Sequence, residues 1–338
     1  MQYPKVYTLD ELSNENIELF FPTYQTKEKL NTSKEIFLKK MPISFVEYTS
    51  QFNTVKQNLL YGNSFLCNLT CQTSIELNAN LDEVFHSVKA KYTIKYKDEW
   101  VCFSPETFVR IEDGTISSYP MKGTIDASLP NAIDTILHDA KELAEHYTIV
   151  DLIRNDLALV ATDIEVKKFR YIDKIVSRDK SLYQVSSHIE GKLPVDYLDR
   201  LGDILFTLLP AGSISGAPKK KTIEIIKEAE NYERGFYTGT TFYFDGQNID
   251  SCVLIRFIEK TESGIVYKSG GGITIHSEVE KEYQVITRQM AKEMARSRDC
   301  HCVLGKDRDT NFDSVIDLIY DHFEQYERNK KLEQILSK

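Results

Sequence analysis

The stretch Thr241-Phe242-Tyr243-Phe244-Asp245-Gly246-Gln247-Asn248-Ile249 decides the fold class. Its first four residues are of the types that favour strands, and Ile249 begins a second apolar run that reaches Ile258. Between the two runs, Asp245-Gly246 is a dipeptide typical of a tight hairpin turn, in which glycine readily adopts positive φ. A short turn joins antiparallel strands, because parallel neighbours need a long crossover connection. The stretch therefore predicts an antiparallel sheet.

Further strand-like segments surround this hairpin. Gly264 to Ser269 extends the sheet, and we expect Gly270-Gly271-Gly272 to break it. Upstream, Ser64 to Glu76 alternates as a long strand, and residues 100–103 and 108–111 indicate two more. Strands and helices mix without a regular βαβ alternation. The sequence therefore predicts an α+β fold with a large antiparallel component.

Several helices are expected, and three of them lie between Ala132 and Ala295. Ala132 to Tyr147 carries apolar residues at a period of about 3.6, as on one buried face of a helix, and Glu278 to Ala295 shows a similar pattern. A third helix starts near Ser215-Gly216-Ala217-Pro218. There Ser215 can cap the first turn, and proline suits the beginning of a helix.

Composition excludes several classes of function. The chain has 338 residues, with 42 Lys plus Arg against 51 Asp plus Glu, so its net charge is −9. An acidic balance disfavours nucleic acid as the main partner, since the phosphate backbone attracts basic surfaces. No apolar run approaches the ~18 residues that span a bilayer. The N-terminus lacks the basic start and apolar stretch of a signal peptide, so we expect a cytoplasmic protein.

The six cysteines are too few for a disulfide framework in a chain of this length. Buried free thiols are the ordinary interpretation of Cys67 and Cys71. Cys300-His301-Cys302 could contribute to a zinc site, but it lacks a second ligand pair at finger-like spacing. The sequence therefore favours free thiols over a zinc-dependent regulatory protein.

Lys122 is the candidate for unusual chemistry. In Pro120-Met121-Lys122-Gly123-Thr124 it stands between a residue of fixed φ and a permissive glycine. If the side chain faces a pocket of low dielectric, its ammonium form is disfavoured and the free amine can act as a nucleophile. Most lysines are instead solvated surface groups. The other motifs in the chain decide between the two interpretations.

Five motifs occur in an order and spacing typical of one family. They are SPETF (Ser104–Phe108), PMKGT (Pro120–Thr124), EHYTIVDLIRNDL (Glu145–Leu157), GSISGAPKKKTIEII (Gly212–Ile226), and GGGI followed by HSEVEKEY (Gly270–Tyr283). From about Phe52 to about Arg298 the chain resembles the chorismate-utilising enzymes, which include anthranilate, aminodeoxychorismate, isochorismate and salicylate synthases.

The resemblance implies an α+β fold in which two large antiparallel β-sheets pack together, flanked by helices, around a central cleft. It divides the chain into an N-terminal segment of residues 1–51 that contributes to the sheets, a chorismate-binding catalytic domain of residues 52–298, and a helical extension of residues 299–338. The extension could cap a sheet, dock a partner or form a dimer.

Within the family, Lys122 points to aminodeoxychorismate synthase component I, because anthranilate synthases typically carry alanine at this position. The resemblance implies that this lysine attacks chorismate at carbon two and expels the hydroxyl at carbon four, after which ammonia adds there. The product would feed the synthesis of 4-aminobenzoate and folate. A separate glutamine amidotransferase is the implied ammonia source, since the chain shows no glutaminase nucleophile motif.

Three glutamates take roles by the same resemblance. Glu106 matches the general acid, which protonates a departing hydroxyl and needs a raised pKa to do so. Glu145 and Glu282 match the ligands of a magnesium ion, which binds few carboxylates together with waters and substrate oxygens. Considered alone, Glu106 could be a cap after Pro105, and the other two could be solvated helix charges.

The substrate-binding residues are also implied by the motifs. Arg256 matches an arginine that binds a substrate carboxylate through its two-pronged guanidinium. Backbone N–H groups of a glycine run can approach a carboxylate closely. The implied set is Arg256, Ser213, Tyr243, Thr124, Gly270, Gly271 and Gly272.

Three departures from the family pattern bear on the function. Leu66 stands where isochorismate and salicylate synthases have a lysine that activates water, so water addition is disfavoured. Gln184 replaces a histidine that the family associates with ring chemistry, and it cannot titrate. Val285 replaces a further glutamate. The remaining alternatives are anthranilate synthase component I and a non-catalytic chorismate-binding relative.

Overall fold

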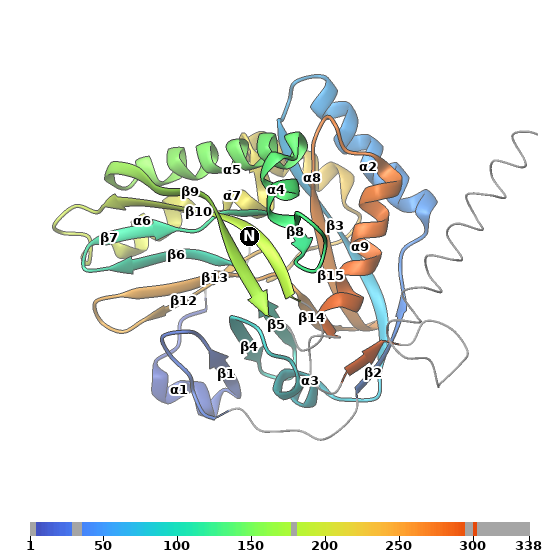
Figure 1. Cartoon of the computed structure of the whole chain (residues 1–338). Coiled ribbons are helices and arrows are strands. Elements are labelled where there is room, and N and C mark those ends of the chain that lie inside the picture. The colour runs from blue at the N-terminus through green and yellow to red at the C-terminus, as the bar shows by residue number, and fades with distance from the viewer. Residues whose placement is uncertain (1–4, 29–35, 177–180, 295–299, 303–338) are drawn as a thin grey trace, which may run out of the picture.

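The computed structural model describes residues 5–28, 36–176, 181–294 and 300–302, and its strands form two sheets (Figure 1). Within the described residues, the first sheet has nine strands. Their path is β1 (Ile17–Phe20), β4 (Tyr92–Tyr96), β5 (Trp100–Ser104), β14 (Phe257–Thr261), β15 (Gly264–Ile273), β3 (Leu66–Leu77), β2 (Ile36–Met41) and β16 (Cys300–Cys302), with β11 (Gly216–Ala217) beside β3.

The second sheet has seven strands among the described residues. Their path is β12 (Thr240–Phe244), β13 (Ile249–Val253), β6 (Thr107–Glu112), β7 (Thr115–Ser118), β10 (Ser181–Lys192) and β8 (Met121–Asp126), with β9 (Thr162–Val176) beside β10. The described pairings of both sheets are antiparallel except that of β16 with β2. The expected hairpin at Asp245-Gly246 is present, since β12 pairs with β13 across it.

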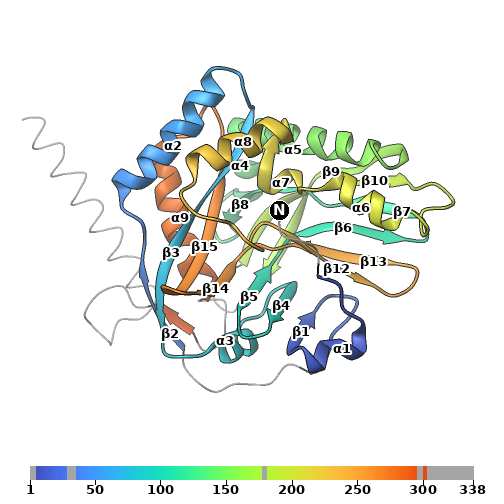
Figure 2. The same ribbon diagram turned by 180° about the vertical axis from the view of Figure 1, so that it is seen from behind.

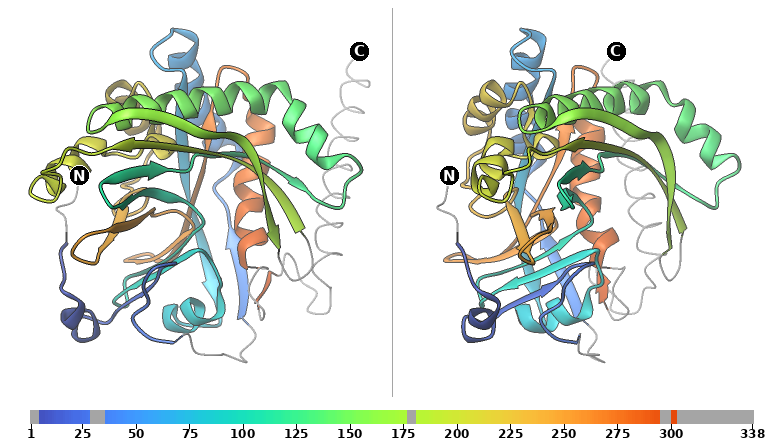
Figure 3. Two further views of the ribbon diagram at one scale, coloured as in Figure 1. Left: turned by 60° about the vertical axis from the view of Figure 1, so that its left-hand side comes forward. Right: turned by 90° about the vertical axis from the view of Figure 1, so that its left-hand side faces the viewer.

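Helices cover the outer faces of both sheets. α2, α8 and α9 pack beside β3 and β15, and the long hairpin of β9 and β10 arches beneath α5 (Figure 3). Seen from behind, α7 and α8 lie beside β3 (Figure 2). The helices are α1 (Leu9–Asn14), α2 (Phe45–Leu60), α3 (Leu81–Ser87), α4 (Ala132–His138), α5 (Ala140–Ala158), α6 (Leu201–Leu208), α7 (Gly212–Ser215), α8 (Lys219–Ala229) and α9 (Val279–Met294).

The expected α+β fold with two large antiparallel sheets is confirmed. One apolar cluster joins α2 and α8 to β3, and another joins α5 and α6 to the second sheet. Within β3, Cys67, Leu69 and Cys71 face the helices, so Asn68 and Thr70 point to the opposite face. This alternation leaves polar side chains of a central strand available to the interior between the sheets.

Three expectations about element boundaries are wrong. The glycine run does not end a strand, because β15 continues through Gly270–Gly272 and pairs with β3 along its whole length. The helix expected from Ala132 to Tyr147 is interrupted at Asp139, whose carboxylate accepts a hydrogen bond from Glu142 N (2.8 Å) and caps α5. Ser215 ends α7 rather than capping α8, and its hydroxyl donates to Ala211 O.

The thiol expectation holds where the structure tests it. Cys67, Cys71, Cys102 and Cys252 are free and buried. The side chains of Cys300 and Cys302 lie outside the described part of the chain, as does the predicted helical extension beyond Cys302. Among the described residues, no helix is both long enough and apolar enough to cross a membrane.

Candidate active site

Lys122 lies on β8, beside the first turns of α5. Its Nζ is 3.6 Å from Glu145 Oε2, and the two side chains are only 23% and 12% exposed. Gly123 makes this approach possible, because it has φ +83° and a Cβ added to it would lie 3.0 Å from Glu142 Oε2. A side chain at position 123 would therefore strain the backbone and crowd the end of the Glu142 side chain. The lysine is held inside the molecule beside one of the predicted magnesium ligands.

The glycine run of β15 forms the opposite wall of the site. A Cβ added to Gly272 would lie 3.2 Å from Lys122 Nζ, and one added to Gly271 would lie 3.6 Å from Glu282 Oε2. Gly270 is bare for another reason, since its added Cβ would lie 2.7 Å from the Leu69 carbonyl oxygen. The run thus places Glu282 and Lys122 beside two successive residues of one strand, whose side-chain positions point to opposite faces.

Glu106 occupies the loop between β5 and β6. Its backbone N donates to Ser104 Oγ (3.1 Å), and the Ser213 hydroxyl donates to its carboxylate. Burial raises the pKa of Glu106, while the Ser213 hydrogen bond and the positive charges of Lys122 and Arg256 act in the opposite direction. A raised pKa keeps the carboxyl protonated over a wider range of pH, as a general acid requires.

Arg256 lies in the short connection between β13 and β14. Its φ is +61°, an uncommon conformation for a residue with a side chain. Its carbonyl oxygen accepts a hydrogen bond from Phe103 N (3.1 Å), which fixes the connection to β5. Strained backbone of this kind is concentrated at functional sites, and the charge of Arg256 reaches Glu106.

Glu145 and Glu282 could hold a magnesium ion. They come from α5 and α9 and are both partly buried. Glu145 lies beside Lys122, and Glu282 lies beside Gly271 of the glycine run. Their carboxylate oxygens are the hard donors that magnesium prefers, so the residues present fit this ion. By contrast, the cluster of Glu18, Asp82 and His86 is filled by the ammonium of Lys95, whose Nζ lies 2.5 Å from Glu18 Oε1.

Comparison with known proteins identifies the family. Residues 5–292 match the chorismate binding enzyme family. The chain belongs to this family. An uncharacterized PabA-like protein of Haemophilus influenzae is 51% identical over 251 residues, covering 74% of this chain and 76% of the relative. Aminodeoxychorismate synthase component 1 of Bacillus subtilis is 29% identical over 252 residues, covering 70% of this chain and 52% of the relative.

A solved structure agrees with this membership. Anthranilate synthase component I from Streptococcus pneumoniae TIGR4 superposes with a TM-score of 0.65 at 26% identity. The superposition covers 77% of this chain and 60% of the solved one. The two-sheet fold is therefore shared with chorismate-binding enzymes, and this chain is an enzyme family member that acts on chorismate.

In this family member, an ion pair that the sequence did not reveal holds Ser213 in place. Arg234 Nη2 donates to Asn68 O (2.7 Å), and its Nη1 donates to Ile214 O (3.2 Å). Arg234 Nε donates in turn to Glu230 Oε2 (2.8 Å), whose side chain is almost fully buried. The pair ties α7, and with it Ser213, to the central strand β3. Its signal in the sequence is the spacing of opposite charges four residues apart.

His146 is a second residue that the sequence motif contained but did not explain. Its ring is fully buried, and Nε2 lies 2.7 Å from Ser187 Oγ. Burial, with the charges of Arg170 and Lys122, lowers the pKa of His146 to about 4. Ser187 N donates to Pro120 O (2.9 Å), immediately before β8. The neutral histidine therefore belongs to the packing that positions the Lys122 strand.

Two predicted binding residues have surroundings of a different kind. Tyr243 stacks on Tyr24, with ring centroids 4.3 Å apart, in an aromatic cluster beside β1. Tyr237, by contrast, is buried and lies within reach of the charges of Arg234 and Arg256. Thr124 is exposed and stands opposite Gln184 in the pairing of β8 with β10. The substrate roles of Tyr243 and Thr124 stay predictions.

The three departures also have defined places. Leu66 is buried, and its Cδ1 would lie 3.0 Å from a Cβ added to Gly272, so an apolar group adjoins the site. Gln184 lies on β10 opposite the Lys122 strand. Val285 is 45% exposed on α9, one turn after Glu282. Apolar Leu66 near the lysine offers no base to activate water.

Proposed function

We propose that this enzyme is an aminodeoxychorismate synthase component I, which converts chorismate and ammonia to 4-amino-4-deoxychorismate. The observation that carries the proposal is the placement of Lys122, whose amine lies 3.6 Å from Glu145 and faces the bare backbone of Gly272. A largely buried amine that faces bare backbone suits a covalent nucleophile. The product would serve 4-aminobenzoate and folate synthesis.

The proposed reaction has two displacements. The Lys122 amine forms a bond to carbon two of the ring, the double bonds shift, and the bond from carbon four to its hydroxyl breaks. Glu106 gives its proton to the departing hydroxyl, which leaves as water. Ammonia then bonds to carbon four, the bond between Lys122 and carbon two breaks, and Glu106 takes up the proton that ammonia loses. Each step needs only a positioned amine and one acid.

The other residues bind and orient the substrate in this proposal. Arg256, whose charge reaches Glu106, would pair with a substrate carboxylate in two-pronged fashion. Glu145 and Glu282 would hold magnesium, which supplies positive charge to a ring carboxylate when it is bound. Ammonia would come from a separate glutamine amidotransferase, as the family resemblance implies.

Anthranilate synthase component I is the second candidate, because a protein of that name shares the fold at 26% identity. The two activities differ in the carbon that receives nitrogen and in whether pyruvate is eliminated. Lys122 supports the first candidate, since anthranilate synthases typically carry alanine at this position. Gln184 disfavours pyruvate elimination, because it cannot titrate where relatives commonly carry histidine. The reaction product distinguishes the two.

The test uses the purified protein with chorismate, an ammonium salt and magnesium, and identifies the product by mass and retention. We expect aminodeoxychorismate, and we expect Lys122→Ala to lose most turnover when ammonia is limiting. Lys192→Ala is the matched control, because Lys192 is 73% exposed on β10 and pairs with Asp163 at the surface. Formation of anthranilate, or full activity of Lys122→Ala, would refute the proposal.

A further inference from the structure

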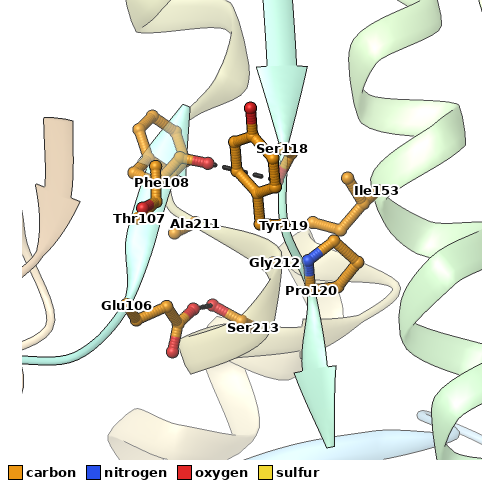
Figure 4. Close-up of a pocket in the computed structure, with 10 residues that line it drawn as sticks. All are labelled: Glu106, Thr107, Phe108, Ser118, Tyr119, Pro120, Ile153, Ala211, Gly212 and Ser213. Atoms are coloured by element: carbon orange, nitrogen blue, oxygen red, sulfur yellow. Dashed lines mark hydrogen bonds between the residues drawn. The ribbon is translucent and has the colours of Figure 1, made fainter. Parts of the chain in front are cut away.

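A small cavity lies behind Glu106, on the side that carries Ser213. Its volume is about 20 Å³, and it is enclosed between β6, the end of β7, α5 and α7. Figure 4 shows the Glu106 carboxylate and the Ser213 hydroxyl at one end of the lining. The polar lining comes from Glu106, Thr107, Ser118, Tyr119 and Ser213, and Ile153 of α5 closes one side.

The size of the cavity selects its occupant. A space of roughly 10–15 Å³ already accommodates one water-sized molecule, so about 20 Å³ suits one such molecule. Its walls mix hydrogen-bonding groups with the apolar side chains of Phe108, Ile153 and Ala211. Such surroundings favour a neutral polar molecule, because an ion would lose its hydration without gaining a full set of partners.

Glu106 connects the cavity with the reacting groups. One carboxylate oxygen accepts the Ser213 hydrogen bond, while the other points away from Ser213 (Figure 4). The charges of Lys122 and Arg256 both act on this carboxyl. A molecule in the cavity therefore lies next to the group that exchanges protons in the proposed reaction.

We propose that this cavity binds ammonia, the second substrate, before it adds to the ring. The inference rests on the proposed amination of chorismate. Ammonia and water are alike in size, and the neutral molecule offers three N–H donors to the carboxylate and hydroxyl oxygens of the lining. When ammonia forms its bond to carbon four and the bond to Lys122 breaks, the surplus proton passes to the neighbouring Glu106 carboxylate.

Methylamine tests the size limit, since it differs from ammonia by one methyl group. Ile153→Val removes one methyl group from the cavity wall, and Ile149→Val is the matched control from the same helix and apolar cluster, outside the lining. A pocket distinguishes substrates that differ by one methylene about 10- to 200-fold. We expect Ile153→Val to raise the kcat/KM of methylamine relative to ammonia by about tenfold or more, at equal free-base concentrations, and Ile149→Val to leave the ratio unchanged.

Ala211→Val tests the same cavity in the opposite direction, because it adds bulk to the lining. We expect kcat/KM for ammonia to fall about tenfold, while KM for chorismate stays within about twofold. Equal methylamine ratios in the two isoleucine variants, or an unchanged ammonia dependence in Ala211→Val, would overturn the cavity assignment and leave the proposed function standing. Formation of anthranilate by the wild type would overturn the proposed function alone. The kcat/KM of methylamine relative to ammonia could then be measured on that product, and it would still test the cavity. A protein that aminates nothing overturns both.

Discussion

Gly272 and Gly270 lie two residues apart on β15, and alanine at these positions should affect different properties. Gly272→Ala should lower activity, and Gly270→Ala should lower stability. At Gly272 the added Cβ would lie 3.0 Å from Leu66 Cδ1 and 3.2 Å from Lys122 Nζ, which are both ends of flexible side chains. At Gly270 it would lie 2.5 Å from Thr70 Cγ2 and 2.7 Å from the Leu69 carbonyl oxygen. The first site can yield by moving the lysine, whereas the second requires movement of the β3 backbone.

These contacts set the expected magnitudes. Gly272→Ala should keep its stability within about 1 kcal/mol, because alanine in a strand recovers part of the entropy that glycine loses. Its amine is displaced and the space beside it is filled, so kcat/KM should fall about 100-fold, as for a misplacement near 1 Å. Gly270→Ala should lose about 1–3 kcal/mol of unfolding free energy through overpacking.

The assay is urea unfolding followed by tryptophan fluorescence, together with amination kinetics on the folded fraction. Gly246→Ala is the control, since its Cβ would enter open space, although its φ of +102° adds some backbone strain. An active Gly272→Ala variant would refute the placement of Lys122 against β15. So would a Gly272→Ala variant that is destabilised as much as Gly270→Ala.

Two further predictions follow from buried charges. Because burial raises the pKa of Glu106, the folded state binds its proton more tightly than the unfolded state, so this carboxyl costs stability as pH rises through its folded pKa. Glu106→Gln should therefore melt at the same temperature as the wild type in acid and at a higher temperature in alkali, and it should lose amination. A melting difference that does not depend on pH would contradict the assignment. Arg234→Ala should lose about 3–5 kcal/mol of unfolding free energy, because Glu230 is left buried without its charge partner. In urea unfolding, the double variant Arg234→Met, Glu230→Gln should recover much of this loss. No recovery would show that the pair stabilises the fold through its shape alone.

Local chemistry explains why some elements could be predicted from the sequence. The Asp245-Gly246 hairpin forms as expected, because Asp245 Oδ1 accepts hydrogen bonds from Gln247 N (2.8 Å) and Asn248 N (2.6 Å) within the turn itself. The strand through the glycine run was not predicted, because the run is bare for reasons that lie far away in the sequence: the close approach of β3 and of Lys122. The interruption at Asp139 was missed because a capping aspartate resembles any other polar residue within an apolar pattern.

The site divides in the same way. Lys122, Glu106, Glu145 and Glu282 were predicted through motifs whose spacing identifies a family. The structure places Lys122 beside Glu145 and within reach of Glu106, and Glu282 beside the glycine run. The structural roles of the Glu230–Arg234 pair and of His146 were not predicted. Charged and imidazole side chains ordinarily lie at the surface, and their burial depends on the tertiary fold. Tyr237 was not singled out from the sequence, because only the packing shows that it is buried near two arginines while Tyr243 stacks on Tyr24.

The proposed chemistry depends on how the two sheets meet. Lys122 and Glu145 belong to the second sheet and its covering helix α5, whereas Gly272 and Glu282 belong to β15 and to α9, which packs on it. The nucleophile therefore comes from one half of the structure and the bare backbone opposite it comes from the other half. Because protein interiors are close-packed, a shift of either sheet would change the distance from the amine to the substrate space directly. Contacts such as the Arg234 bonds, which tie α7 to β3 of the first sheet, thus help to hold the two halves in position without touching the nucleophile.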